Sequence, residues 1–438
     1  MKDENELRKE ILEKVHEIYN LRKKSETFIA GKSRIQYSGR VYDENEMMAV
    51  VNSAIDFWLT LGKNSLEFTS AFKKFLGINN CLVTNSGSSA NLIAVSSLCS
   101  KQLVNPLRNG DEVITTAVAF PTTLNPILQN NLKPVFVDIE EGTYNIDPKL
   151  IELAITEKTK AIIFAHTLGN PADMEKIMDI AKKNKLYVIE DTCDALGSTY
   201  DGKYCGTFGD FSTYSFYAAH HITMGEGGAV CSDNPELSRI ALSIRDWGRA
   251  CYCGPGERNP KGACNHRFDF KFGNMPEGYD HKYIYTNIGY NLKPLDIQCA
   301  MGIKQLEKLP IFIKKRKENF QRLYDGLKEY EDKLILPKAY DKADPAWFSF
   351  PITVRETSGF TRGEFVKFLE EKGIETRMLF AGNVLNQPAY KDIEYKSVGE
   401  LKASKQVLTS TFFIGVYPGI TNEMMDYMLD TIEEFFKS

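Results

Sequence analysis

Short apolar runs alternate with helical segments over residues 65–300, and this pattern predicts a layered fold. The runs are rich in Val, Ile and Phe, and each is short enough to be a buried strand. The clearest runs are residues 80–85, 111–116, 133–138, 161–167 and 186–191. Segments with helical patterning separate most of them. This alternation favours an α/β structure with a largely parallel sheet.

The patterning outside this region is mainly helical. An amphipathic helix is predicted near the start, with an apolar face made of Leu7, Ile11, Val15 and Ile18. A long helical stretch covers 296–330, followed by a strand at 347–354 and a helix at 361–373. We expect three parts, which are an N-terminal helical arm (1–49), a large domain (50–315) and a small C-terminal α+β domain (316–438).

One segment, residues 250–283, departs from all periodic patterns. It is rich in Gly, Pro, Asn and Cys. A loop of this length inside a compact domain is usually functional or disordered.

Composition narrows the class of protein. The chain of 438 residues is 43% apolar and 26% charged. Its net charge is −4, so it lacks the excess of positive charge that is typical of nucleic-acid-binding proteins. No apolar run approaches the roughly 20 residues that span a bilayer, and the N-terminus is too charged for a signal peptide. We therefore expect a cytoplasmic protein, whose nine cysteines are thiols, metal ligands or core residues rather than disulfides.

Three motifs at strand ends carry candidate chemistry. In TNSGSSAN (84–91), Gly87, Ser88 and Ser89 open a helix and could bind a phosphate, although Gly-Ser turns are common in this context. In LYVIED (186–191), Asp191 could bond a pyridinium nitrogen or cap a helix. In VAFPTT (118–123), Phe120 could stack on a planar ring or lie in the core.

The segment STYSFYAAHHITMGEGGAVC (212–231) predicts two strands joined by a turn of small residues. The turn holds His220 and His221, two of only six histidines. Histidine moves protons near neutral pH. For His221 we favour an ordinary hairpin residue over a catalytic one.

Taken together, several motifs resemble the sugar aminotransferase family that uses pyridoxal phosphate. They occur in that family's order and spacing, and they are SGSSANL, FPTTLNPI, HTLGNPADM, VIEDTCDALGS, SFYAAHHITMGEGG, RDWGR and GYNLKPLDIQCAMG. The resemblance covers most of residues 50–438. It implies a type I, aspartate aminotransferase-like fold, with a large mixed or parallel sheet domain, and a homodimer with its active site at the subunit interface.

The resemblance also implies roles for individual residues. The cofactor phosphate is expected to bind Gly87, Ser88, Ser89 and Ser215. Asn291 is expected to reach the phosphate of the neighbouring subunit. Phe120 would stack on the cofactor ring, and Asp191 would bond its nitrogen.

The family's catalytic lysine is missing. Its turn has the pattern Ser-Phe-His-x-x-Lys, whereas this chain has His220 at the lysine position, and no lysine lies between Lys203 and Lys261. An imidazole cannot form the covalent cofactor bond that the lysine makes. The expected cofactor is therefore pyridoxamine phosphate, with His220 as the base that takes its C4′ proton.

This exchange resembles the 3-dehydrases of dideoxysugar biosynthesis, which remove the C3 hydroxyl from a nucleotide-linked 4-keto-6-deoxyhexose. Two further departures from the aminotransferase pattern agree with it. Asp194 replaces the usual Gln, and Tyr217 replaces the usual His. We expect both beside the cofactor, with catalytic roles.

The cysteines resemble those of the 3-dehydrases that act on CDP-4-keto-6-deoxyglucose and carry a [2Fe–2S] cluster. The predicted ligands are Cys193, Cys251, Cys253 and Cys264. The last spacing is longer here than in that family, so His266 is an alternative final ligand, and four thiolates also suit zinc. A cluster implies electrons from a separate NADH-dependent flavin and iron–sulfur reductase, which we expect to dock near 250–283. The other cysteines are expected to be structural, namely Cys81, Cys99, Cys205, Cys231 and Cys299.

The alternatives differ in class. A cluster-free GDP-4-keto-6-deoxymannose 3-dehydratase also has histidine in place of the lysine, but it does not need the cysteines of the 250–283 loop. A true aminotransferase conflicts with His220. A non-catalytic pyridoxal-fold binding protein is compatible with loss of the lysine alone. Arg377 and Lys293 could meet a pyrophosphate, but surface or structural roles are equally compatible with the sequence.

Overall fold

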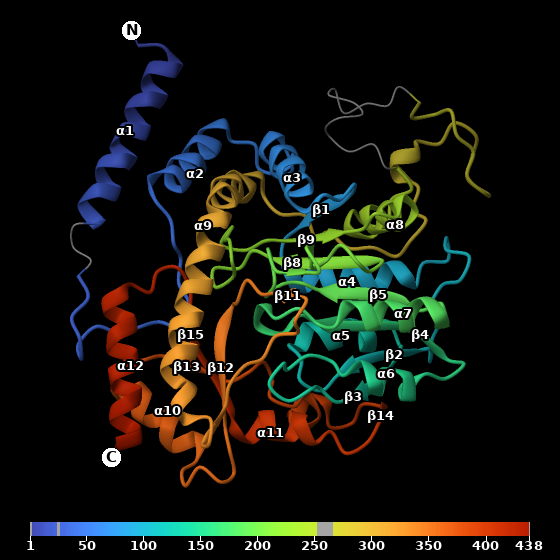
Figure 1. The fold of residues 1–438 in the computed structure, drawn as a ribbon. Helices are drawn as coiled ribbons and strands as arrows, with labels where there is room; N and C mark the ends of the chain where they lie inside the picture. The colour runs from blue at the N-terminus through green and yellow to red at the C-terminus, as the bar shows by residue number, and fades with distance from the viewer. Residues whose placement is uncertain (1, 24–26, 252–265, 438) are drawn as a thin grey trace.

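The computed structural model describes residues 2–23, 27–251 and 266–437. Over these residues the strands form an eight-stranded, a four-stranded and a three-stranded sheet (Figure 1). Cys253 and Cys264 lie outside the described residues.

The eight-stranded sheet has the order β1-β9-β8-β5-β4-β2-β3-β14. The run from β8 to β14 is parallel, and β9 is antiparallel to both of its neighbours. The predicted parallel sheet is thereby confirmed. Its strands are β1 (Cys81–Thr84), β2 (Glu112–Thr116), β3 (Lys133–Val137), β4 (Thr159–Ala165), β5 (Tyr187–Asp191), β8 (Phe211–Ser215), β9 (Gly228–Cys231) and β14 (Lys396–Ser397).

Helices cover both faces of this sheet. One face packs on α4 (Gly87–Leu98), α5 (Pro121–Gln129) and α8 (Pro235–Arg245), and the other on α6 (Pro148–Ala154) and α7 (Met174–Asn184). α4 is apolar nearly all round and buries nine of its residues, as expected for a helix inside a large core. α3 (Lys63–Leu76) packs at the β1 end of the sheet and against α9 (Asp296–Leu327).

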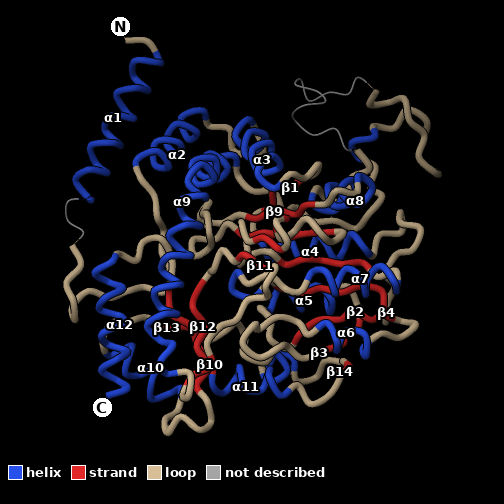
Figure 2. Tube along the Cα trace, in the orientation of Figure 1, coloured by secondary structure: helices blue, strands red, loops and turns tan. Residues whose placement is uncertain are grey.

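The four-stranded sheet has the order β10-β12-β15-β13 and lies beside the large sheet (Figure 2). It is entirely antiparallel and packs on α9, α10 (Arg362–Glu371) and α12 (Asn422–Lys437) around a separate core. The strands are β10 (Leu334–Ile335), β12 (Ser349–Val354), β13 (Thr376–Arg377) and β15 (Thr411–Gly415). α9 runs past residue 315, where we expect the boundary, and its two halves serve different cores. The domain division stays a prediction.

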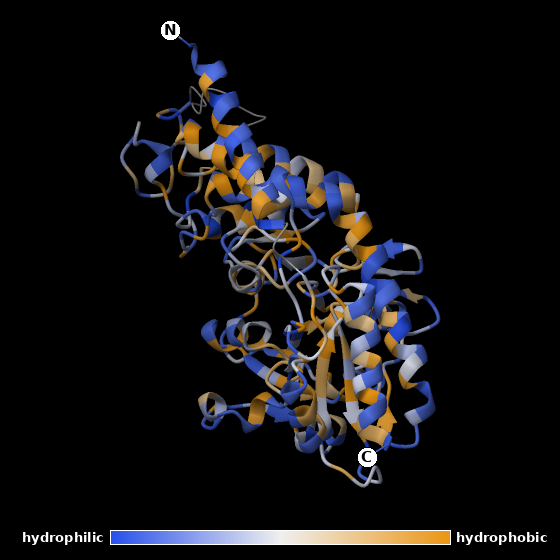
Figure 3. Cartoon of the chain, turned by 90° about the vertical axis from the view of Figure 1, so that its left-hand side faces the viewer, coloured by the Kyte–Doolittle hydropathy of each residue, from blue (hydrophilic) through white to orange (hydrophobic). Residues whose placement is uncertain are grey.

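The remaining elements are short or peripheral. The three-stranded sheet consists of β11 (Ala343–Asp344), β6 (Thr199–Tyr200) and β7 (Lys203–Tyr204), and α11 (Lys402–Ser410) lies beside β12 and β15. α1 (Glu4–Lys23) packs against α2 (Glu44–Asp56) and extends away from the body (Figure 3). Only Val15 of its predicted apolar face is buried. No helix in the described part of the chain is long and apolar enough to cross a membrane.

Candidate active site

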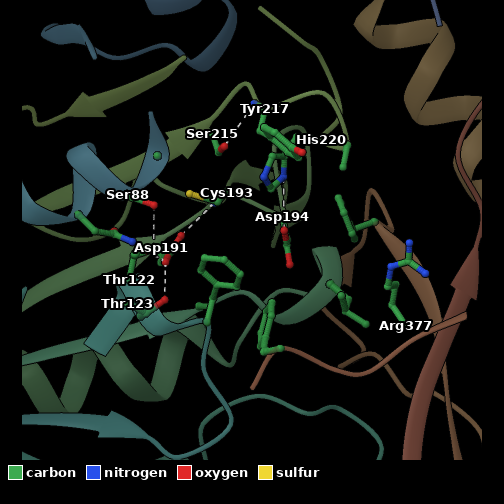
Figure 4. Close-up of a pocket in the computed structure, with 18 of the residues that line it drawn as sticks. Ser88, Thr122, Thr123, Asp191, Cys193, Asp194, Ser215, Tyr217, His220 and Arg377 are labelled. Carbon is green, nitrogen blue, oxygen red and sulfur yellow. Dashed lines mark hydrogen bonds and ion pairs between the residues drawn. The ribbon is translucent and has the colours of Figure 1, made fainter. Parts of the chain in front are cut away.

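A cavity of about 290 Å³ lies at the carboxyl ends of the parallel strands β4, β5 and β8 (Figure 4). This edge is where open α/β sheets bind ligands. Its walls come from the first turns of α4 and α5, the β8–β9 hairpin and the four-stranded sheet. Most of the predicted site residues meet here, and those lining the cavity are Gly87, Ser88, Phe120, Asp191, Cys193, Asp194, Ser215, Tyr217 and His220.

One end of the cavity has the features of an anion site. Gly87 and Ser88 begin α4, whose N-terminus favours negative charge. A Cβ on Gly87 would lie 2.6 Å from the Ser215 Cβ and 2.8 Å from the Cys193 Sγ, so only glycine leaves this space free. The Ser88 hydroxyl donates to Thr122 Oγ1 at 3.0 Å. Hydroxyls and a helix N-terminus therefore converge where a phosphate group fits.

Asp191 is held rigidly at the end of β5. Its Oδ2 accepts hydrogen bonds from Asn91 Nδ2 at 2.8 Å and Thr123 Oγ1 at 2.7 Å. Its Oδ1 accepts from the Cys193 amide at 3.2 Å. A turn and not a helix follows Asp191, so the alternative role as a helix cap is wrong. The carboxyl is buried yet lines the cavity, so it is placed to accept a bond from a protonated ring nitrogen.

Phe120 lies in the cavity wall rather than in the core. It is the N-cap of α5, and its residue is 52% exposed. Its ring meets Phe380 edge-on, with centroids 6.4 Å apart. An aromatic face, a carboxylate and a phosphate cradle in one cavity fit pyridoxal or pyridoxamine phosphate.

His220 faces Asp194 inside this cavity. The His220 Nδ1 lies 3.4 Å from Asp194 Oδ1, and neither Nδ1 nor Asp194 Oδ2 has a hydrogen-bond partner. Burial, together with the nearby Arg316 charge, lowers the pKa of His220 to about 4, although the Asp191 charge opposes this shift. Burial and repulsion from Asp191 raise the pKa of Asp194 to about 7. Between pH 4 and pH 7 both groups are therefore neutral, and His220 is free to accept a proton.

Arg316 supports the hairpin from behind. It is fully buried on α9 and donates to the carbonyls of Trp347 and Phe348, and at 3.4 Å to that of His220. Burial lowers its pKa to about 9. His221 points elsewhere, because its Nε2 contacts the Ala346 carbonyl and the ring is buried. This placement agrees with a structural role for His221.

The far wall consists of residues that sequence reasoning did not assign to the cavity, apart from Arg377. They are Tyr37, Phe348, Arg377, Met378, Phe380 and Phe413. They come from separate segments, which only the folded chain brings together. In contrast, Asn91, Thr122 and Thr123 lie inside the motifs SGSSANL and FPTT. Their place in these motifs was a signal that could have identified them as residues of the site.

Two predicted cofactor residues do not line the cavity. Ser89 turns toward the cap of α4, where its amide donates to Ser86 Oγ at 3.1 Å. Asn291 is exposed, and its Oδ1 accepts from Lys293 Nζ at 2.6 Å. Its predicted contact with a neighbouring subunit lies beyond a single chain and stays a prediction.

Two of the four predicted metal ligands, Cys193 and Cys251, lie in the described part of the chain. Cys193 lines the cofactor cavity, whereas Cys251 lines another cavity, beside Arg239 and Arg249, that shares no residue with the first. Residues 2–23, 27–251 and 266–437 hold no group of three or more His, Cys, Asp or Glu that could bind a metal. The expected structural cysteines are all buried except Cys99, which is partly exposed.

Comparison with known proteins places the chain. The DegT/DnrJ/EryC1/StrS aminotransferase family matches residues 41–433. The chain belongs to this family. It is 50% identical over 433 residues to the lipopolysaccharide biosynthesis protein RfbH of Salmonella typhimurium, covering 99% of this chain and 98% of that protein. It is 49% identical to the dTDP-4-dehydro-2,6-dideoxy-D-glucose 3-dehydratase of Saccharopolyspora spinosa, covering 95% and 90%.

Solved structures of the family agree. The GDP-4-keto-6-deoxy-D-mannose-3-dehydratase of E. coli with bound hydrated PLP superposes with a TM-score of 0.82. The two are 29% identical, and the match covers 91% of this chain and 99% of that one. The DegT/DnrJ/EryC1/StrS chain described here therefore has the fold of type I, PLP-dependent aminotransferase-like enzymes, as its motifs imply.

Proposed function

We propose that the protein is a pyridoxamine phosphate-dependent dehydratase that removes the C3 hydroxyl of a nucleotide-linked 4-keto-6-deoxyhexose. One observation carries the proposal. His220 stands at the family's lysine position, neutral and buried against Asp194, while the rest of the cofactor cavity is intact. Asp191 is also held by three hydrogen bonds, which a protein that no longer bound the cofactor would not require.

The chain's own residues divide the work. When bound, pyridoxamine phosphate supplies an amine that condenses with a ketone and a ring that stabilises negative charge. Gly87, Ser88 and Ser215 hold its phosphate, and Phe120 and Asp191 orient its ring. His220 takes the C4′ proton. A proton must leave with the C3 hydroxyl as water, and Asp194 and Tyr217, which line the same cavity, are the proposed groups that transfer it.

The substrate class is supported by several relatives. Beside the S. spinosa enzyme, a GDP-4-keto-6-deoxy-D-mannose 3-dehydratase of Yersinia pseudotuberculosis is 34% identical over 379 residues. These two names give two different nucleotides and two different sugars for the same type of reaction, a 3-dehydration. We propose CDP as the nucleotide here, because the cysteine pattern resembles that of the CDP-linked enzymes, and a product on the way to a 3,6-dideoxysugar of a lipopolysaccharide O-antigen.

A [2Fe–2S] cluster is the second part of the proposal, and the sequence alone supports it. Cys193, Cys251, Cys253 and Cys264 are its proposed ligands, with His266 as the alternative to Cys264. Cys193 lines the cofactor cavity and Cys251 lines a second cavity. With a cluster goes an NADH-dependent reductase as partner, and we further propose a cytoplasmic homodimer.

The position of Cys193 favours one second candidate. A cluster-free dehydratase of the GDP-4-keto-6-deoxymannose type, which recycles its cofactor with glutamate, needs no cysteine site and uses the same cavity. In that case Cys193 is a wall residue of the cofactor cavity.

The test is product analysis with a panel of substrates. Protein loaded with pyridoxamine phosphate is incubated with CDP-, dTDP- and GDP-linked 4-keto-6-deoxyhexoses, and the products are analysed by mass spectrometry. Loss of water from C3 supports the proposal, and the preferred nucleotide follows from the relative rates. Replacement of the ketone by an amine would identify an aminotransferase. Bound cofactor without turnover of any substrate would point to a binding protein.

A further inference from the structure

The cavity has a fixed order from one end to the other. Ser88 and Thr122 lie at the phosphate end, Asp191 and His220 follow, and Arg377 stands on the opposite side (Figure 4). The reacting carbons of a sugar must lie beside His220. A group on the sugar's anomeric carbon, on the other side of the ring, then extends away from the cofactor phosphate and toward Arg377.

Arg377 is the only Lys or Arg among the residues that line this cavity. It ends β13 of the four-stranded sheet, and 44% of its side chain is exposed. Arg316 is buried behind the wall, and Arg34, which lies near Glu375, does not line the cavity. Arg377 is therefore the one positive charge of the described cavity wall that a soluble anion can reach.

The guanidinium is held in place before any ligand arrives. It stacks on the Tyr37 ring, with the Cζ 4.5 Å from the ring centroid. Its NH1 donates to the Thr376 carbonyl at 2.8 Å and its NH2 to Glu375 Oε1 at 2.5 Å. Glu375 also lies 3.6 Å from Arg34, so two arginines share this carboxylate. An immobilised fork loses little entropy on binding an anion.

We propose that Arg377, stacked on Tyr37, binds the diphosphate of the nucleotide sugar. This inference rests on the proposed function and names the subsite that recognises its substrate. A nucleoside diphosphate sugar carries its negative charge next to the anomeric carbon, and Arg forms charge-assisted, bidentate bonds with phosphate oxygens. Tyr37 and Arg377 come from segments that flank the large domain, so the subsite exists only in the folded chain.

The test measures binding without turnover. Calorimetry compares CDP, dTDP and GDP with the matching nucleosides on protein loaded with pyridoxamine phosphate. We expect Arg377→Ala to weaken diphosphate binding about tenfold or more and to leave nucleoside binding unchanged. Arg377→Lys keeps the charge but loses the fork, so its loss is smaller. Arg322→Ala, which removes a partly exposed arginine paired with Asp426, is the matched control and should bind like the wild type.

The outcomes separate this inference from the function it rests on. Equal diphosphate affinity in wild type and Arg377→Ala overturns the subsite, even if the enzyme dehydrates its substrate. A tenfold loss of diphosphate affinity supports the subsite even if the reaction proves to be a different one. A variant that loses nucleoside binding to the same extent would show a general disturbance of the cavity and would also overturn the assignment.

Discussion

At the scale of single residues, His220 and Asp194 form a buried pair whose charges are suppressed. Burial opposes a charge on each of them, which is why the pKa of His220 falls and that of Asp194 rises. A neutral imidazole can accept a proton, and the imidazolium that results is balanced by a carboxylate when Asp194 gives its own proton to the departing hydroxyl. The pair therefore suits proton transfer better than the ion pair its 3.4 Å separation suggests.

The first prediction separates the two neighbouring histidines. His220→Asn should lower kcat by about 10²-fold or more, the usual contribution of a general base. His221→Gln should instead lower the free energy of unfolding by about 1–3 kcal/mol, because it disturbs a buried contact with Ala346. Steady-state rates and thermal unfolding of both variants check this. Equal loss of kcat in both would contradict the division of roles.

The second prediction concerns the pH dependence of stability in cofactor-free protein. Asp194 keeps its proton up to about pH 7 in the fold but loses it near pH 4 when unfolded, so its contribution to stability falls as pH rises from 4 to 7. His220 has a folded pKa of about 4 and an unfolded one near 6.5, so its contribution rises over almost the same window. The two slopes largely cancel in the wild type.

Removing either group should expose the slope of the other. His220→Asn should become less stable from pH 4 to 7, and Asp194→Asn more stable from pH 4 to 6.5, each by about 1–3 kcal/mol. Urea unfolding at a series of pH values measures both. If the two variants keep the wild-type pH profile, neither side chain has the shifted pKa described here.

At the scale of elements, the N-terminus of α4 decides whether a phosphate can bind. The helix begins at a glycine because β8 and Cys193 approach it closely. Ser86 caps the helix through its bond to the Ser89 amide, which leaves Ser88 and the Gly87 backbone facing the cavity. The sequence predicted the start of this helix, and the phosphate role of Gly87, Ser88 and Ser89 stays a prediction. Ser89 is not among the residues that line the cavity, and its hydroxyl accepts a hydrogen bond from Ser86 Oγ at 3.0 Å.

The third prediction tests this cradle. Gly87→Ala places a Cβ within 2.6 Å of the Ser215 Cβ and should weaken binding of pyridoxamine phosphate at least about tenfold, because the hairpin and the helix must move apart. Gly363→Ala is the control, since its Cβ meets only a side chain at 3.8 Å on an exposed helix. Fluorescence titration of the cofactor checks both. If Gly87→Ala bound the cofactor with wild-type affinity, the cofactor phosphate would not bind at the N-terminus of α4.

At the scale of the whole molecule, local patterns predicted much of the frame but little of the far wall. The five buried strands, the β8–β9 hairpin, α4, α9 and α10 follow from runs and periodicities that lie within one segment. The cavity wall made of Tyr37, Phe348 and Phe413 joins segments far apart in the sequence. These side chains are ordinary aromatics in their local context, and only packing between the two sheets gives them a common position.

The fourth prediction concerns the cysteines as a group. Anaerobically purified protein should contain two irons and two sulfides per chain, lost together in Cys251→Ser. Cys193→Ser should lose the iron in the same way and should also change cofactor binding, because Cys193 lines the cofactor cavity. Iron and acid-labile sulfide assays measure the first effect. Absence of iron in the wild type would favour the cluster-free dehydratase, and full retention of iron in Cys193→Ser would remove Cys193 from the proposed ligands.

The central claim is that His220 removes the C4′ proton in place of the family's lysine chemistry. The most direct measurement uses pyridoxamine phosphate deuterated at C4′, bound to wild type and to His220→Asn, with a CDP-, dTDP- or GDP-linked 4-keto-6-deoxyhexose. We predict that the wild type loses one deuterium to solvent while substrate is present and that the variant, with cofactor bound, retains it. Equal loss of label in both proteins, or retention in a wild type that turns its substrate over, would contradict this account.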